Sequence, residues 1–291
     1  RAKLALHEGV PTEQILCGNG AADLIFRLVW ARKPSRALVT APTFAEYATA
    51  LESVGCTVER FFLREQEDFV VTDAFCAAIR PGVDMVFLCQ PNNPTGQLTA
   101  LPLVEQILHR CAACGTLLVV DECFLDFLPD HALHTAKGLL REGNLVILKA
   151  FTKLYGMAGV RLGYALSADT ALLEQMQACG QPWGVSSLAQ EAGLAALEET
   201  AYVEKVRALI AEQRPRLTAG LRALGLRVLD GRANYLLFQA PETLGEALRQ
   251  RGAVLRSCAN YPGLGPGWYR TAVRTGPENE QLLKLLAEVL E

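Results

Sequence analysis

Lys153 is a candidate reactive amine. It ends the segment Lys149-Ala-Phe-Thr-Lys153, which directly follows the apolar run Leu145–Leu148. A lysine in apolar surroundings loses its proton more readily than one in water, and the neutral amine can form a Schiff base with a carbonyl compound. A single lysine is more often a solvated surface charge, so Lys153 gains meaning only from the residues that accompany it.

Two turns that suit a bound ligand follow other apolar runs. Gly18-Asn-Gly-Ala-Ala-Asp23 stands between the predicted strand Ile15–Cys17 and the predicted helix Ala21–Arg32. Free N–H groups at a helix N-terminus attract a phosphate, although glycine turns before helices are common and this one matches no nucleotide-binding motif. Pro91-Asn-Asn-Pro-Thr-Gly96 follows the predicted strand Met85–Cys89. Its prolines predict a rigid turn, and its paired amides could bond a polar ring substituent.

Two charged residues complete the set. Asp121, followed by Glu122, ends the apolar run Leu117–Val120, where a carboxylate is costly unless it is paired, solvated or functional. It either caps a helix or turn, or it keeps a nearby heterocyclic nitrogen protonated. Arg161 stands eight residues after Lys153. Each of these segments accompanies a predicted strand, and α/β sheets bind ligands at the carboxyl ends of their strands.

The elements that must position these residues alternate between strand and helix. Several strands are near-continuous apolar runs, which is typical of strands covered on both faces. This alternation predicts an α/β fold with a mainly parallel sheet. The predicted strands are Ile15–Cys17, Ala37–Thr40, Thr57–Leu63, Met85–Cys89, Leu117–Val120, Leu145–Leu148 and Gly163–Leu166, and the helices between them include Ala21–Arg32, Phe44–Val54 and Leu101–Ala113.

A smaller second region is predicted after residue 185. Ser186–Arg214 has the pattern of a long amphipathic helix, which Pro215 is expected to break, and an α+β pattern follows. We expect a large domain over 1–185, a bridging helix over 186–215 and a small C-terminal domain over 216–291. Its predicted strands are Leu226–Leu229, Tyr235–Gln239, Val254–Arg256 and Tyr269–Val273, with helices at Glu242–Gln250 and Glu278–Leu290.

The composition narrows the possible binding partners of the protein and its possible cellular compartment. The chain has 291 residues, of which 51% are hydrophobic, and a net charge of −3. No basic run points to nucleic acid, and no apolar run or signal peptide points to a membrane. Nine cysteines, with Cys111 and Cys114 in CxxC spacing, are interpreted as buried thiols because no second pair completes a metal site. These features favour a reducing cytoplasm and no bound metal.

The ordered segments resemble a known motif set. Pro91–Gly96, Asp121-Glu122 and Thr152-Lys153 through Arg161 are together similar to the motifs of the fold-type I pyridoxal 5′-phosphate (PLP) enzymes, the aspartate aminotransferase superfamily. The resemblance covers essentially the whole chain. It implies the fold-type I PLP-dependent transferase fold, with a mainly parallel seven-stranded sheet and a small α+β domain. It also implies PLP as cofactor and a homodimer with its active site at the subunit interface.

The resemblance implies a role for each matching residue. Lys153 matches the lysine that holds PLP as a Schiff base, and Asp121 matches the partner of the pyridine nitrogen. Asn93 matches the residue that bonds the ring oxygen, and Phe44 matches the aromatic residue that stacks on the ring. The residues that match phosphate ligands are Thr152, Arg161 and the amides of Gly20, Ala21 and Ala22.

Two branches of the superfamily compete, the histidinol-phosphate aminotransferases and the L-threonine-O-3-phosphate decarboxylases. Asp121–Phe127, Gln181–Ser187 and, most closely, Arg256–Leu264 with Trp268–Arg274 resemble the decarboxylases. The expected reaction is then decarboxylation of L-threonine O-3-phosphate to (R)-1-amino-2-propanol O-2-phosphate in cobalamin biosynthesis. The alternatives are a transamination with 2-oxoglutarate and, remotely, a non-catalytic PLP-binding regulator.

The same match implies substrate contacts. Arg256 and Arg270, together with Asn93, would bind the substrate's phosphate and carboxylate, because guanidinium groups grip oxyanions through paired hydrogen bonds. Weaker candidates for the pocket are Arg274, Tyr261, Trp183 and Asn234.

Some positions depart from the superfamily's pattern. Phe124 stands where many aminotransferases have a tyrosine that bonds the ring oxygen, which fits the decarboxylase branch. Ala150 replaces a usual Ser or Thr, so fewer phosphate contacts are expected. The chain starts at Arg1 in a helix-like pattern without an initiator Met, so the superfamily's N-terminal arm is expected to lie upstream.

Overall fold

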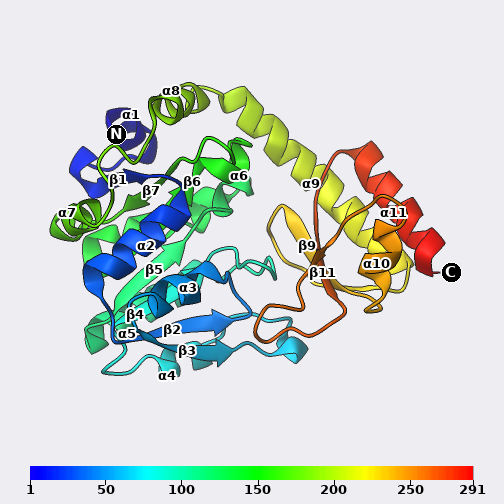
Figure 1. Ribbon diagram of the computed structural model, residues 1–291, viewed down its shortest axis with the longest axis horizontal. Coiled ribbons are helices and arrows are strands. Elements are labelled where there is room, and N and C mark those ends of the chain that lie inside the picture. The colour runs from blue at the N-terminus through cyan, green and yellow to red at the C-terminus, as the bar shows by residue number, and fades with distance from the viewer. Residues whose placement is uncertain (291) are drawn as a thin grey trace.

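A computed structural model describes residues 1–290 and contains two β-sheets (Figure 1). The larger sheet has seven strands in the order β1-β7-β6-β5-β4-β2-β3. In it, β7 (Gly163–Leu166) runs antiparallel to β1 and β6, and the other neighbouring strands are parallel. The prediction of a mainly parallel seven-stranded sheet is confirmed. The remaining strands are β1 (Ile15–Gly18), β2 (Arg36–Ala41), β3 (Thr57–Phe62), β4 (Met85–Cys89), β5 (Leu117–Asp121) and β6 (Leu145–Ala150).

Helices cover both faces of this sheet, which explains its continuous apolar runs. In β5, Leu118 and Val120 belong to the core that includes α5 (Leu101–Cys114), whereas Val119 belongs to the core that includes α2 (Ala21–Arg32). Successive side chains of a strand point to opposite faces, so both sets must be apolar. The other helices of this region are α1 (Ala2–Glu8), α3 (Glu46–Glu52), α4 (Ala74–Ala78), α6 (Phe151–Leu154) and α7 (Thr170–Ala178), with 3-10 turns at Thr12–Gln14, Glu65–Glu67, Leu125–Phe127, His131–Leu133 and Ala136–Glu142.

The smaller sheet has four antiparallel strands in the order β10-β11-β9-β8. Its core is shared with α10 (Leu244–Arg249), α11 (Gly276–Leu290) and the C-terminal part of α9 (Thr200–Ala223). The α+β pattern predicted for the C-terminal region is thus present in the structure. The strands are β8 (Arg227–Val228), β9 (Tyr235–Gln239), β10 (Arg256–Ser257) and β11 (Trp268–Ala272).

One prediction about the connecting helix is wrong. The chain forms α8 (Ser187–Ala196) and then α9, and α9 continues through Pro215 to Ala223 instead of ending before the proline. Proline removes one backbone hydrogen bond. Packing on both sides offsets this loss, because Ile210 lies in one apolar cluster while Leu217 lies in another. Figure 1 shows α9 running from the seven-stranded sheet to the smaller one. Division of the chain at residues 185 and 215 stays a prediction.

Within residues 1–290, each helix is too short or too polar to cross a membrane.

Candidate active site

Residues from five segments meet along one edge of the seven-stranded sheet. The end of β5 carries Asp121, and β5 lies between β4 and β6, which lead to Asn93 and Lys153. Phe44 follows β2, the strand on the other side of β4. Arg161 reaches the same edge because it precedes β7, which is antiparallel to β6. Strand order therefore brings together candidates that are far apart in sequence.

Asp121 is a buried carboxylate without a cationic partner in the described chain. It is 5% exposed. The hydroxyl of Tyr47 donates to Oδ2 at 2.6 Å, and the backbone N–H of Cys123 donates to Oδ1 at 3.0 Å. No Lys, Arg or His nitrogen within residues 1–290 lies within 4.0 Å of its oxygens. A buried unpaired charge is costly, so this position suits a ligand that brings a positive charge, such as a protonated heterocycle.

Three side chains close to Asp121, those of Tyr47, Cys89 and Cys123, are neutral. Burial and then the charge of Asp121 raise the pKa of Tyr47 well above its usual range. The same two causes raise the pKa of Cys89 to about 12 and that of Cys123 well above its usual range. All three groups therefore remain protonated and neutral at neutral pH, so they add no further negative charge beside the carboxylate.

The N-terminus of α2 offers two free amides beside a guanidinium group. Gly20 has φ +85°, and a Cβ there would lie 2.7 Å from Nη2 of Arg161. The N–H of Gly20 already donates to the Gly18 carbonyl at 2.8 Å, which differs from its expected part in phosphate binding. The N–H groups of Ala21 and Ala22 have no acceptor among the described residues. The free N–H groups of these two residues and the guanidinium group of Arg161 therefore form a candidate anion-binding site.

Close packing of β7 under α2 supports this arrangement. A Cβ on Gly163 would lie 2.6 Å from the backbone nitrogen of Ala21, so a glycine is required for the two elements to approach. Arg161 itself has φ +62° and donates to the Ala158 carbonyl at 3.2 Å. Together these contacts set the position of the guanidinium group at the helix N-terminus.

Lys153 lies in a cavity of about 710 Å³ between the two sheets. The lysine is exposed on the short helix α6, and its Nζ lies 5.3 Å from the centre of the Phe124 ring. Its neighbour Thr152 is 9% exposed. The same cavity is lined from the C-terminal region by residues that include Asn234, Tyr235, Arg256, Arg270 and Arg274.

Four arginines of the C-terminal region line this cavity, namely Arg251, Arg256, Arg270 and Arg274. Arg256 and Arg270 are directly opposite each other in the β10–β11 pair, so their side chains share one face. Arg270 donates to Oδ1 of Asn93, and its guanidinium group lies 4.9 Å from the centre of the Tyr235 ring. Arg274 pairs with Glu278 at 2.7 Å. The cavity beside Lys153 is therefore strongly cationic.

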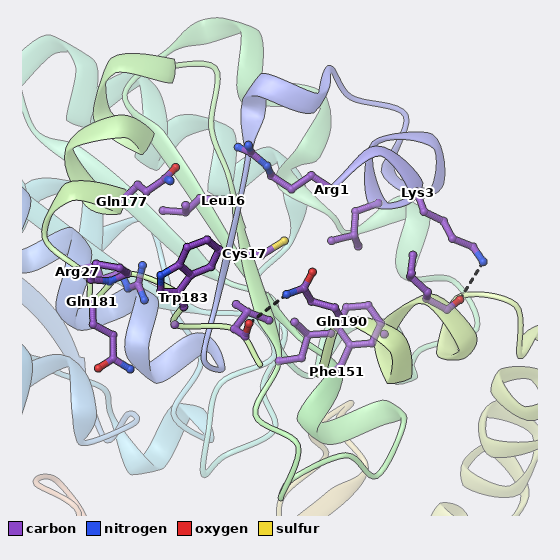
Figure 2. A pocket seen from close by; sticks show the side chains of 18 of the residues that line it. Arg1, Lys3, Leu16, Cys17, Arg27, Phe151, Gln177, Gln181, Trp183 and Gln190 are labelled. Atoms are coloured by element: carbon purple, nitrogen blue, oxygen red, sulfur yellow. Dashed lines mark hydrogen bonds between the residues drawn. The ribbon is translucent and has the colours of Figure 1, made fainter. Parts of the chain in front are cut away.

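The weaker candidates divide between two places. Tyr261 is buried and donates to Oδ1 of Asn93 at 3.4 Å, and Asn234 lines the Lys153 cavity with an Oδ1 that has no described partner. Trp183 is 96% exposed and lines a different cavity of about 1070 Å³, next to Arg27 and Gln181 (Figure 2). Within one chain, Trp183 is not brought to Lys153.

Two tyrosines were missed as site residues. Tyr47 bonds Asp121, and Tyr235 donates to the Asn92 carbonyl at 2.9 Å while it contacts Arg270. Tyr47 stands three residues after Phe44 in a predicted helix, which hinted that the two share a face. Nothing in the sequence pointed to its bond with Asp121.

A buried charge cluster behind α6 was also missed. Nζ of Lys149 lies 2.8 Å from Oδ1 of Asp126 and 3.5 Å from Oε1 of Glu8, and Lys137 pairs with the other oxygen of Glu8 at 3.0 Å. Burial alone would raise the pKa of Glu8, but Lys149, a hydrogen bond from Tyr164 and Lys137 lower it to about 2. The cluster ties α1 and the segment after β5 to β6, just before Lys153.

The family model for aminotransferase class I and II matches residues 2–289. The chain belongs to this family. A threonine-phosphate decarboxylase of Salmonella typhimurium is 40% identical over 291 residues, which are 99% of this chain and 80% of that protein. A histidinol-phosphate aminotransferase of Symbiobacterium thermophilum is 35% identical over 297 residues, covering 100% of this chain and 80% of that protein.

A comparison with a solved structure agrees with this family assignment. The crystal structure of L-threonine-O-3-phosphate decarboxylase from Porphyromonas gingivalis superimposes with a TM-score of 0.85 at 25% identity, covering 99% of this chain and 87% of that one. The chain is accordingly a PLP-dependent enzyme with the fold of the class I and II aminotransferases.

Proposed function

We propose that this chain decarboxylates L-threonine O-3-phosphate to (R)-1-amino-2-propanol O-2-phosphate, as a step of cobalamin biosynthesis. The observation that carries the proposal is the cavity in which Lys153 faces Arg256, Arg270 and Arg274. A phosphorylated amino acid brings a phosphate and a carboxylate, and paired guanidinium groups bind both kinds of oxyanion. The 40% identity to a protein named threonine-phosphate decarboxylase supports the same substrate.

The residues of the sheet edge fit PLP in five ways. Asp121, buried without a cationic partner in the described chain, would pair with the pyridine nitrogen. Lys153 would hold the aldehyde carbon, and the amide of Asn93 would bond the ring oxygen. Phe44 would stack on the ring. The phosphate would lie on Thr152, Arg161 and the free amides of Ala21 and Ala22.

When bound, PLP supplies an electron-accepting ring next to Cα of the substrate. The protein itself then has two tasks, which are to orient the substrate and to move a proton. We propose that Arg256 and Arg270 would hold the substrate by its anionic groups, so that the bond from Cα to the carboxylate carbon is the one presented for cleavage. Carbon dioxide would leave, and the electron pair of the broken bond would form the new C–H bond with a proton from Nζ of Lys153.

We further propose a cytoplasmic homodimer with its active site at the subunit interface. Trp183 and Leu188 are 96% and 81% exposed and follow each other closely in the chain. A second copy would remove such an apolar surface from water. We also propose that the chain divides into a large domain over 1–185, a bridging region over 186–215 and a small domain over 216–291.

Turnover decides between the candidate reactions. The PLP-loaded protein is incubated with L-threonine O-3-phosphate, and carbon dioxide and aminopropanol phosphate are expected without any 2-oxo acid. Conversion of histidinol phosphate that depends on 2-oxoglutarate, with no decarboxylation, would instead identify an aminotransferase.

Lys153→Ala should remove the borohydride-reducible linkage to PLP, whereas Lys205→Ala, at an exposed lysine, should retain it. Retention of the linkage in Lys153→Ala would exclude the proposed role of Lys153.

A further inference from the structure

Tyr47 connects two residues that are proposed to contact the cofactor ring. Its hydroxyl donates to Oδ2 of Asp121 at 2.6 Å, and its ring packs edge-on against Phe44 with centroids 5.5 Å apart at 83°. The tyrosine ring also stacks on Phe87 of β4, with ring centroids 4.7 Å apart and an interplanar angle of 14°. The side chain is fully buried. Its position is therefore determined by the packing of α3 against the sheet.

The bond from Tyr47 completes the fixation of Asp121. One oxygen of the carboxylate accepts a hydrogen bond from the N–H of Cys123, two residues further along the same chain, and this bond fixes only one side of the carboxylate. Tyr47 occupies the other oxygen, so the plane of the carboxylate cannot rotate without loss of a hydrogen bond to a charged group. Tyr47 is also a neutral donor, because burial and Asp121 keep its proton in place. It orients the carboxylate without cancelling its charge.

A purely structural explanation is that a buried tyrosine needs some acceptor for its hydroxyl. Tyr269 shows what this looks like elsewhere in the chain. It is 4% exposed, and its hydroxyl donates to the Glu242 carbonyl at 2.7 Å, a backbone group far from the sheet edge. Tyr47 differs because its acceptor is the unpaired carboxylate itself. Tyr269 is thus a matched control for the loss of a buried hydroxyl.

We propose that Tyr47 is a positioning residue for the cofactor ring, which holds the carboxylate of Asp121 in line with the pyridine nitrogen and supports Phe44 against the ring face. This inference rests on the proposed function, in which Asp121 pairs with that nitrogen. It predicts that removal of one hydroxyl group affects the binding of a ring that contains the nitrogen more than the binding of a ring that lacks it.

The test compares two ligands on the apoprotein. Tyr47→Phe is titrated with PLP and with the analogue in which a C–H group replaces the ring nitrogen, and binding is followed by protein fluorescence. We expect about tenfold weaker binding of PLP, the effect of losing one hydrogen bond to a charged group, and a change under about twofold for the analogue. Tyr269→Phe should bind both ligands as the unmodified protein does. Equal losses for both ligands, unchanged PLP binding or tighter PLP binding would overturn the proposal.

Two further measurements keep the outcomes separate. Asp121→Asn should weaken PLP binding but not analogue binding, and if it leaves PLP binding unchanged the proposed role of Asp121 fails, independently of Tyr47. If Tyr47→Phe does not fold, 3-fluorotyrosine placed at position 47 keeps the ring shape and makes the hydroxyl a stronger donor. A changed affinity for PLP alone then supports the proposal, and unchanged affinity for both ligands refutes it.

Discussion

Lys149→Met perturbs the buried cluster that joins three segments behind the active site. The side chain of Lys149 is 7% exposed and lies between the carboxylates of Asp126 and Glu8. Glu8 belongs to α1, Asp126 follows β5, and Lys149 is on β6 four residues before Lys153. Methionine fills a similar apolar volume and removes only the charge and the donors. The variant therefore isolates the electrostatic contribution of the lysine.

The expected loss of stability is large because the two carboxylates stay behind. The side chain of Glu8 is 3% exposed and that of Asp126 is 26% exposed, so water screens the first of them poorly. Removing one partner of a buried ion pair costs about 3–5 kcal/mol. Lys137 also pairs with Glu8, but its side chain is 32% exposed. We expect Lys137→Met to cost about 1 kcal/mol, near the upper end for exposed pairs.

Urea unfolding of the apoprotein at pH 7, followed by circular dichroism, measures both variants. The free energy of unfolding of Lys149→Met should fall by about 3–5 kcal/mol with an unchanged dependence on urea. Adding Glu8→Gln to Lys149→Met should recover part of the loss, since it removes one uncompensated charge. A loss below about 1 kcal/mol for Lys149→Met, equal to that of Lys137→Met, would show that the cluster is well solvated and would refute the reasoning.

Two more predictions follow from the same structure. Gly20→Ala places a methyl group 2.7 Å from Nη2 of Arg161 and should weaken PLP binding to the apoprotein about tenfold, the effect of one charge-assisted hydrogen bond. Gly55→Ala, at φ +77° with nothing near its added Cβ, should lower stability without affecting PLP binding, and an equal effect on binding would contradict this account. The second prediction concerns acid: the pKa of Glu8 is lowered from 4.5 to about 2 in the folded chain, so its contribution, about 3 kcal/mol, is complete above pH 4.5 and is lost as the pH falls toward 2. The stability difference between the unmodified protein and Lys149→Met, measured by urea unfolding across this range, should shrink with falling pH, and a constant difference would exclude Glu8 as its source.

Local patterns in the sequence determined most of the elements. Met85–Cys89 and Gly163–Leu166 are strands with the predicted bounds, and Ala21–Arg32 is a helix with the predicted bounds. These predictions succeed because a strand covered on both faces must be apolar at every position, and because glycine, here Gly20, is a favoured N-cap residue at the start of a helix. The strand pattern likewise places Asp121 at the end of β5 and Lys153 shortly after the end of β6.

Tertiary structure alone decided the contacts between segments. Pro215 lies inside α9 because apolar packing on both sides offsets its missing hydrogen bond, which no local rule shows. Tyr47 and Asp121 are 74 residues apart, and they meet only because β2, β4 and β5 are neighbours in one sheet. The sequence by itself therefore determined which residues stand at strand ends and which chemistry they offer. Only the order of the strands decided which side chain holds which, because hydrogen bonds and ion pairs between distant segments depend on distances that local pattern does not contain.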